Sequence, residues 1–167
     1  MRYVMKQKWL SWGKDYYIRD EDGKDVFYVD GRVFSIGEKL SFEDMSGNEL
    51  AFISQKLLSW GPAYRIYAGG ELYATVSKKL FTFFRCKFKV DVPGPDDLIA
   101  QGSFLDHEYT FTRHGDIVAS VSKRWFSWTD TYGIDITSGE DDILILASAV
   151  VIDLVCHEEE NVADDDD

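Results

Sequence analysis

Apolar and polar residues alternate along most of this chain, and the alternation predicts β-strands. Successive residues of a strand point to opposite faces, so the apolar positions define one buried face. Clear alternating runs lie at residues 16–18, 64–66, 88–90 and 132–136. Dipeptides typical of tight hairpin turns separate the runs, including residues 22–23, 46–47, 69–70 and 114–115. The pattern predicts many short antiparallel strands joined by hairpins.

A repeated motif organises these strands. Residues 47–60, 70–83 and 115–128 share a glycine, an alanine, a β-branched residue, a serine, a cation and a final aromatic residue at one spacing. Residues 7–13 supply part of a further copy. A second alternating run follows each copy, so the repeating unit is predicted to be a β-hairpin. The tryptophans recur at the aromatic positions, and we expect them to pack in the core or at its rim: Trp9, Trp12, Trp60, Trp125 and Trp128.

Residues 143–156 replace the alternation with an apolar run, ILILASAVVIDLVC. The run is too long for an ordinary strand and is apolar on every helical face except at Ser148 and Asp153, so we expect a helix that is buried all round. Acidic residues 140–142 precede the run, where negative charge favours a helix N-terminus. At 1.5 Å per residue this helix would be about 21 Å long, short of the roughly 30 Å of a bilayer core. We therefore expect no transmembrane segment.

A soluble β-rich chain must enclose such a helix, and a β-barrel wrapped around it is the simplest arrangement. We predict a mainly β fold, a closed antiparallel β-barrel built from repeated hairpins around a buried hydrophobic C-terminal helix. Residues 1–157 should form a single domain of the 167-residue chain. Residues 158–167 include seven acidic residues and no Lys or Arg, and we expect them to form an acidic disordered tail.

Charge and composition exclude several classes of function. The formal net charge is −12, and nucleic-acid binding needs clustered cations, so we expect no nucleic-acid partner. An acidic, salt-adapted surface is one explanation of this charge. Cys86 and Cys156 lie far apart in apolar settings, which suits reduced core residues better than disulfides or a zinc site. Lys6, Gln7 and Lys8 interrupt the apolar residues near the N-terminus, so we expect no signal peptide and a cytoplasmic location.

The chain offers few groups for catalysis or metal binding. We place His107 in a strand, His114 in a hairpin turn and His157 just after the helix, with no spacing typical of a triad or metal site. Residues 20–25 resemble a calcium loop, but a hairpin turn explains their Asp-Gly pair better. Residues 140–142 are most simply a helix cap, and weak calcium binding is the next interpretation. We expect no catalytic residue, no bound metal and no cofactor.

Asp153 is an acidic residue inside the apolar run. Burying a carboxylate without a partner costs on the order of several kcal/mol, so it must be hydrogen bonded, protonated or placed where the helix leaves the barrel. With the helix ending near residue 156, Asp153 would lie one turn from that end, within reach of strand backbone or of an Arg or Tyr side chain. We expect a structural buried acid rather than a catalytic acid.

Cations gather in one stretch of the chain and suggest a site for anions. Together with the matching place in another repeat, this stretch supplies the candidate ligand-binding residues Lys78, Lys79, Arg85, Lys87, Lys89, Lys123 and Arg124. Arg85, Lys87 and Lys89 alternate with apolar residues, so they should occupy one outward strand face. The alternative is that outward strand positions are charged for solubility and for protection of strand edges.

Several of these segments carry a family resemblance. Residues 122–137, SKRWFSWTDTYGIDIT, are followed by an acidic cap and ILILASAVVIDLV, and residues 28–48, 55–68 and 102–112 are equally characteristic. Over about residues 1–157 the chain resembles the LURP-one-related family, in its bacterial YxjI-like branch. That family belongs to the tubby C-terminal-like superfamily, which includes the phospholipid scramblases. The resemblance implies a barrel of about twelve strands enclosing a hydrophobic C-terminal helix.

The resemblance implies little about function, since one fold hosts many activities. Tubby domains bind phosphoinositides through basic surface residues, scramblases are associated with lipid movement and calcium, and plant relatives are linked to pathogen defence. We expect a non-enzymatic binding or scaffold domain that recognises anionic lipid head groups or a protein partner, in the cytoplasm or peripherally at the membrane. The alternatives are scramblase-like, calcium-assisted lipid handling and an enzyme with a site at the barrel rim. A pocket joining His107 or His157 to Asp153 would favour the enzyme. The sequence makes no prediction of the oligomeric state.

Overall fold

The computed structural model describes residues 1–10, 13–31, 36–82, 85–124 and 131–164. Within these residues the chain forms twelve β-strands followed by one α-helix. The strands, in chain order, are β1 (Arg2–Leu10), β2 (Gly13–Arg19), β3 (Asp25–Gly31), β4 (Lys39–Asp44), β5 (Glu49–Gln55), β6 (Ala63–Ala68), β7 (Glu71–Thr82), β8 (Arg85–Asp91), β9 (Leu98–Ser103), β10 (Glu108–Arg113), β11 (Asp116–Ser122) and β12 (Thr131–Ile136).

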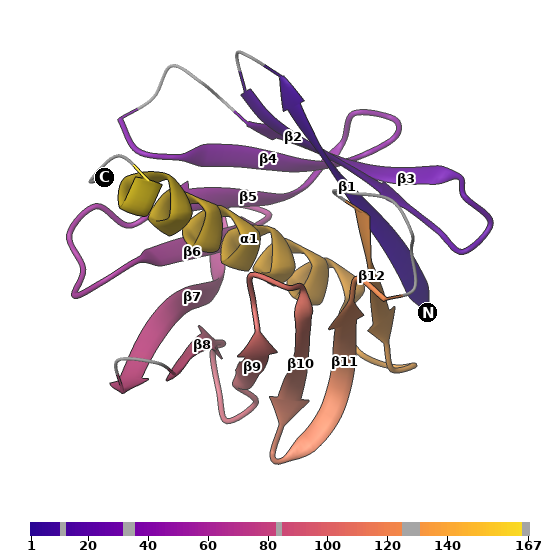
Figure 1. The fold of residues 1–167 in the computed structure, drawn as a ribbon. Coiled ribbons are helices and arrows are strands. Elements are labelled where there is room, and N and C mark those ends of the chain that lie inside the picture. Colours follow the sequence, from indigo (N-terminus) through magenta and orange to yellow (C-terminus); the bar gives the residue numbers. More distant parts are fainter. Residues whose placement is uncertain (11–12, 32–35, 83–84, 125–130, 165–167) are drawn as a thin grey trace.

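All of these strands join one closed antiparallel barrel (Figure 1). Each strand pairs with its neighbour in the sequence, as expected for hairpins. The first strand closes the barrel against the last, with Arg2 opposite Asp135 and Lys6 opposite Thr131. The predicted closed barrel of twelve strands is therefore confirmed, and closure hydrogen-bonds both edges of the sheet.

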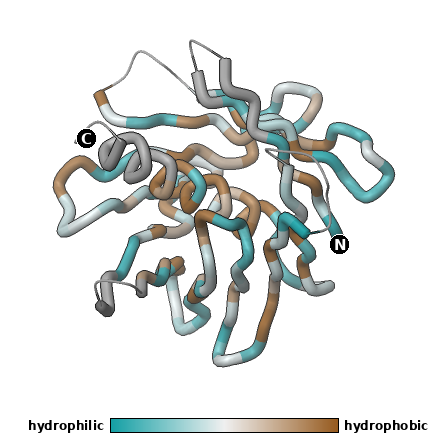
Figure 2. The backbone as a smooth tube through the Cα atoms, viewed as in Figure 1, coloured by the Kyte–Doolittle hydropathy of each residue, from teal (hydrophilic) through white to brown (hydrophobic). Residues whose placement is uncertain are grey.

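The helix α1 (Asp142–Asp164) passes through the barrel, with β4 and β5 on one side and β9 to β11 on the other (Figure 1). Each residue from 144 to 156 is at most 7% exposed. Figure 2 shows the hydrophobic character of this part of the helix and of the strand positions around it. The inward side chains that surround it include Tyr16, Phe42, Phe88 and Phe111, each 0% exposed. The predicted buried helix is confirmed.

The helix is longer than the sequence predicted. We placed its end near residue 156 and expected residues 158–167 to form a disordered tail, but α1 continues to Asp164. A helix that packing has already formed extends at little cost, because each added residue gains a backbone hydrogen bond, and Glu and Ala favour helix. Residues 165–167 lie outside the described residues. In the part of the chain that is described, no helical segment is long and apolar enough to cross a membrane.

The two rims of the barrel differ in what α1 does there. Near its start, Asp142 accepts a hydrogen bond of 2.5 Å from the hydroxyl of Tyr3, at the beginning of β1. Further along, Asp153 lies 3.6 Å from His107, in the turn between β9 and β10. The helix therefore runs from an entry rim, where odd-numbered strands begin, to an exit rim, where they end.

The repeats gather equivalent connections at the exit rim. The three copies correspond to the hairpins β5–β6, β7–β8 and β11–β12, and the partial copy corresponds to β1–β2, which confirms the predicted repeating hairpin. Each copy has the same orientation in the barrel, so the connection that follows its cation joins two strands at the exit rim. The two rims therefore differ, because the equivalent connections of all the copies lie at the exit rim.

Candidate functional site

The connection between β5 and β6 exposes large apolar side chains at the exit rim. The exposed fraction is 59% for Leu57, 91% for Leu58 and 106% for Trp60. Ile36, shortly before β4, is 86% exposed. A Cβ atom at Gly37 would lie 2.9 Å from Cδ2 of Leu57, so the two connections are in contact. We call Ile36, Leu57, Leu58 and Trp60 the rim cluster.

The exposure of Trp60 corrects one sequence prediction. We expected the tryptophans of the repeats to pack in the core or at its rim, and for Trp60 this is wrong. Residues of a core and of an exposed connection share the same apolar chemistry, so the repeat could not distinguish them. Trp60 is exposed because it lies in the connection beyond the last paired residues of β5 and β6. Trp12, Trp125 and Trp128 lie outside the described residues, and the side chain of Trp9 is not described.

Hydrogen bonds hold the backbone of the β5–β6 connection. The amide of Lys56 donates to the carbonyl of Ala63 (2.8 Å), and the amide of Lys78 in β7 donates to the carbonyl of Pro62 (3.1 Å). Gly61 has a φ of 98°, a conformation that favours glycine. The apolar side chains therefore project from a hydrogen-bonded turn that is tied to the neighbouring strand.

The β7–β8 hairpin places cations beside the rim cluster. Lys79 lies directly opposite Lys87 in the ladder. Phe88 is next in β8 and is 0% exposed, so Lys79 and Lys87 face outward. These two cations therefore share the outward face of the β7–β8 hairpin. Arg85 lies opposite Thr82, and its side chain is not described.

Two residues of the predicted anion patch are placed differently from the rest. Lys78 pairs with Phe88, so it follows the inward register of β7 at the rim. The Nζ atom of Lys89 lies 3.0 Å from Asp91 and 2.9 Å from Asp97. Hydrogen bonds to Asp97 and then Asp91 raise the pKa of Lys89, and its charge is already offset by these carboxylates.

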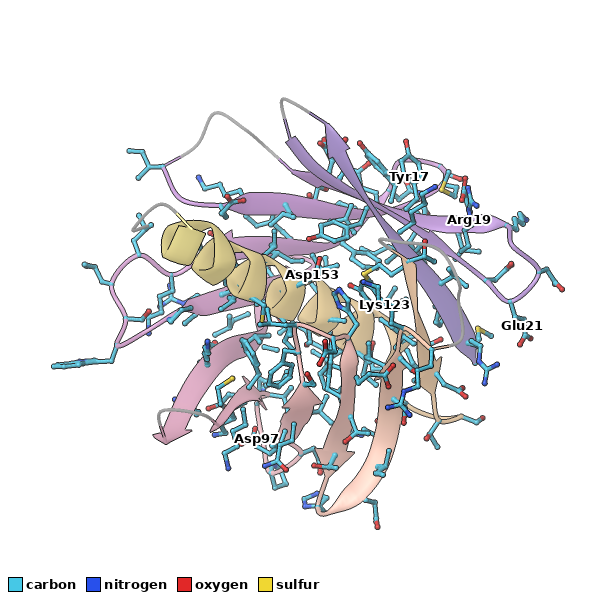
Figure 3. All side chains as sticks on the ribbon, in the orientation of Figure 1. Tyr17, Arg19, Glu21, Asp97, Lys123 and Asp153 are labelled. Carbon is cyan, nitrogen blue, oxygen red and sulfur yellow. The ribbon has the colours of Figure 1, made fainter. Side chains whose placement is uncertain are left out.

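Lys123 and Arg124 lie in a different part of the barrel. They follow β11, where the carboxylate of Glu108 accepts hydrogen bonds from both of their amides, at 3.0 and 3.2 Å. Figure 3 shows Lys123 well apart from Asp97, the partner of Lys89. The predicted cations therefore do not gather in one patch, and among those with described side chains only Lys79 and Lys87 form an outward pair.

Asp153 belongs to a buried polar cluster close to the exit rim (Figure 3). Its side chain is 2% exposed, which confirms the predicted buried acid. Its Oδ2 accepts a hydrogen bond of 3.1 Å from the hydroxyl of Tyr16, and its Oδ1 lies 3.6 Å from Nδ1 of His107. The His107 imidazole stacks on Tyr132, with ring centroids 4.3 Å apart and an interplanar angle of 10°. Side chains from β2, β12 and the β9–β10 turn thus hold the helix at this carboxylate.

The position of His107 corrects its predicted place in a strand. His107 lies in the β9–β10 turn with a φ of 51°, and its amide donates to the carbonyl of Phe104 (3.0 Å). Only the turn directs the imidazole inward to the helix. His114 does occupy the predicted hairpin turn, with its Nε2 3.0 Å from Asp96. The side chain of His157 is not described.

The acidic segments have structural roles. Oδ1 of Asp20 accepts hydrogen bonds from the amides of Asp22 (3.1 Å) and Lys24 (2.9 Å), which confirms the predicted turn. Oδ1 of Asp141 accepts a hydrogen bond of 3.0 Å from the amide of Leu144, as expected of a helix cap. Within the described residues, no three His, Cys, Asp or Glu side chains are grouped so that they could hold a metal ion.

Comparison with known proteins places this barrel in a family. The sequence profile described as LURP-one-related matches residues 1–153. The chain belongs to the LURP-one-related family. It is 37% identical over 157 residues to the Bacillus subtilis protein described as "Uncharacterized protein YxjI", covering 94% of each chain. A solved structure of an Arabidopsis thaliana protein has a similar fold, with a TM-score of 0.65, 19% identity and coverage of 91% of this chain and 89% of that one.

The buried tyrosines of this LURP-one-related barrel predict its response to alkaline pH. Tyr16, Tyr109 and Tyr132 are each at most 4% exposed, and burial, followed by the charge of Asp153, raises the pKa of each hydroxyl. A tyrosine whose pKa is higher in the folded chain stabilises the fold below its unfolded pKa of about 10, and this contribution is lost as the pH rises further. We expect the free energy of unfolding to fall steeply above about pH 10.

Denaturant titrations between neutral and alkaline pH, with tyrosinate absorbance read in parallel, test this expectation. The Tyr16→Phe variant should show a shallower alkaline loss of stability, by about 1.4 kcal/mol per pH unit for one proton fewer. Ionisation of all nine tyrosines in the native protein near their ordinary pKa would contradict it.

Proposed function

We propose that this LURP-one-related domain is a non-enzymatic binding module that docks through its exit rim on the surface of an anionic membrane. The observation that carries the proposal is the exposed rim cluster beside the outward pair Lys79 and Lys87. Apolar side chains with cations beside them suit a membrane interface, because head groups supply negative charge and the region beneath them accepts Trp and Leu side chains.

The position of the cations supports docking by this rim. Lys79 follows Lys78, whose amide is bonded to Pro62, so the lysine pair lies beside the β5–β6 connection. Each cation near an anionic surface contributes about 1 kcal/mol of attraction. The formal net charge of −12 opposes this attraction. We therefore expect weak, salt-sensitive binding rather than tight association.

An enzyme centred on His107 and Asp153 is the second candidate, since the structure brings these two residues to 3.6 Å. Such a pair could act as a general base with its orienting carboxylate. However, Asp153 is 2% exposed and its two oxygens face Tyr16 and His107. A substrate would not reach this carboxylate, so the geometry favours a structural contact.

Calcium-assisted lipid handling receives less support from the described acidic residues. Asp20 and Asp141 bind backbone amides of a turn and a helix start, and Glu140 pairs with Arg113. These carboxylates stabilise local structure, which leaves the docking module as the function that the geometry supports best.

Vesicle flotation over a salt series tests the proposed function. The protein should float with vesicles that contain phosphatidylserine and phosphatidylcholine in equal amounts, and binding should weaken as salt increases. Vesicles of phosphatidylcholine alone should recruit less protein. The Lys79→Glu variant should lower the affinity for anionic vesicles about tenfold, because it replaces an attraction by a repulsion.

Lys24→Glu is the matched control for this experiment. Lys24 is exposed in the β2–β3 turn at the entry rim, so its reversal changes the net charge equally but away from the docking surface. The control should bind like the unmodified protein. An equal loss in both variants, or no binding of the unmodified protein to anionic vesicles, would reject docking by the exit rim and direct the search to a protein partner.

A further inference from the structure

The rim cluster contains the most exposed large apolar side chains in the described part of the chain. Trp60, Leu58 and Ile36 have exposed fractions of 106%, 91% and 86%. Single apolar residues on a surface are ordinary, but neighbouring ones that share a rim mark an interaction site. Leu57 links the two connections, since a Cβ atom at Gly37 would lie 2.9 Å from its Cδ2.

Several polar groups of the β5–β6 connection are bonded within the protein. The Ser59 hydroxyl lies 2.5 Å from the carbonyl oxygen of Gly61 and 3.3 Å from that of Lys56. The amide of Lys56 and the carbonyl of Pro62 are also bonded, to β6 and β7. Moving an unbonded polar group out of water is costly, so these bonds lower the cost of placing the turn in an apolar medium.

Apolar and cationic side chains lie side by side at the exit rim. Leu57, Leu58 and Trp60 lie in the β5–β6 connection, just before Pro62. Lys79 and Lys87 lie beside this connection in the β7–β8 ladder, on the outward face. Trp favours the boundary between acyl chains and head groups, and Lys favours the phosphates above it. The two kinds of side chain together match one bilayer leaflet, which offers an apolar layer and a layer of negative charge.

We infer that the rim cluster inserts into the acyl boundary of one leaflet while Lys79 and Lys87 contact its phosphates. This inference rests on the proposed function and adds the mode of attachment to it. The β5–β6 connection then faces the membrane. Charge brings the domain to the surface, and insertion of the turn retains it there.

Quenching by lipids with brominated acyl chains tests the insertion. Vesicles of phosphatidylcholine and phosphatidylserine in equal amounts, with and without bromine on the acyl chains, are titrated into the unmodified protein and into Trp60→Phe. Bromine quenches only a nearby indole, so the difference between the two proteins reports Trp60. We expect quenching of the unmodified protein and a clear loss of that quenching in Trp60→Phe.

Leu58→Asp and Ile117→Asp form a matched pair for the affinity. Leu58 lies in the rim cluster, whereas Ile117 is 60% exposed in β11 near the entry rim. Both substitutions add one negative charge to an exposed apolar position. Leu58→Asp should weaken binding to anionic vesicles about tenfold or more, because an inserted leucine is lost, and Ile117→Asp should leave it unchanged.

The outcomes separate the inference from the proposed function. Salt-sensitive binding that needs Lys79, without quenching of Trp60 and without an effect of Leu58→Asp, would overturn insertion and leave surface docking in place. Failure of the unmodified protein to bind anionic vesicles would overturn both. A dimer in solution that Leu58→Asp dissociates, without vesicle binding, would assign the cluster to contact between copies of the chain and also overturn insertion.

Discussion

Alanine at position 102 should lower the free energy of unfolding by about 3 to 5 kcal/mol. Gly102 lies in β9 directly opposite Tyr109 in β10, with a φ of 143°. A Cβ atom there would overlap the carbonyl oxygen of Glu108 and lie 2.6 Å from Cα of Tyr109. These are backbone atoms of the neighbouring strand, so no side-chain rotation relieves the overlap and the β9–β10 pairing itself must shift.

Urea denaturation of Gly102→Ala and Gly23→Ala measures the difference. Gly23 also has a positive φ, 79°, but a Cβ atom there meets nothing within 4 Å. Its replacement should therefore cost only the strain of the left-handed conformation, about 1 to 2 kcal/mol. Equal losses in the two variants would show that conformation alone, and not the close approach of the strands, sets the cost at Gly102.

Replacing Asp153 by alanine should destabilise the barrel by about 3 to 5 kcal/mol. The substitution removes the acceptor of the Tyr16 hydroxyl and the carboxylate beside His107, at a side chain that is 2% exposed. Removing one partner from a buried polar contact leaves the desolvation cost of the other in place. The free energy of unfolding, obtained from urea titrations near neutral pH, gives the loss directly.

Two further variants separate the contact from the volume of the side chain. Asp153→Asn keeps a carbonyl oxygen that can accept from Tyr16, so it should cost less than Asp153→Ala. Tyr16→Phe should cost less in the Asp153→Ala background than in the unmodified protein, with a coupling energy of about 0.5 to 3 kcal/mol. Additive losses would refute an energetic link between Tyr16 and Asp153.

The strands were predictable because their signal is local. Alternation at residues 16–18 or 132–136 depends only on which neighbours point inward, and the structure places Tyr16, Ile18, Tyr132 and Ile134 in the core as expected. The buried helix was predictable for a related reason, since an apolar run without a polar face must be enclosed. Its end was not, because residues past 156 extend a helix whose stability comes from packing elsewhere.

The polar cluster around Asp153 could be predicted from the sequence only in part. The apolar setting of Asp153 predicted burial and a bonded partner, and Tyr is the type of partner expected. His107 was named with His157 as a residue that a pocket could join to Asp153, but its place in a turn was missed because its surroundings resemble a strand. A contact between residues 107 and 153 depends on which strand of the closed barrel faces that turn of α1, and no sequence spacing records this.

The sequence predicted which cations of β8 face outward, but it did not predict their partners on the neighbouring strands. Alternation places Lys87 and Lys89 on the outward face of β8, but only pairing shows that Lys79 stands opposite Lys87. Only the fold brings Asp97, at the end of the connection before β9, within 2.9 Å of Lys89. Cations that occupy equivalent outward positions in the sequence pattern therefore differ in their suitability for binding an anion.

By itself the sequence determined the strands, their hairpin repeats, the enclosed helix and the family, because each depends on neighbours in the chain or on a pattern spread over its whole length. Only the tertiary structure decided what the repeats accomplish. Closure of an antiparallel barrel brings the odd-to-even connections to one rim, where Leu58 and Trp60 have no second layer to cover them. Exposure is a property of what surrounds a side chain in space, and an apolar residue has the same letter in a core and on a docking surface.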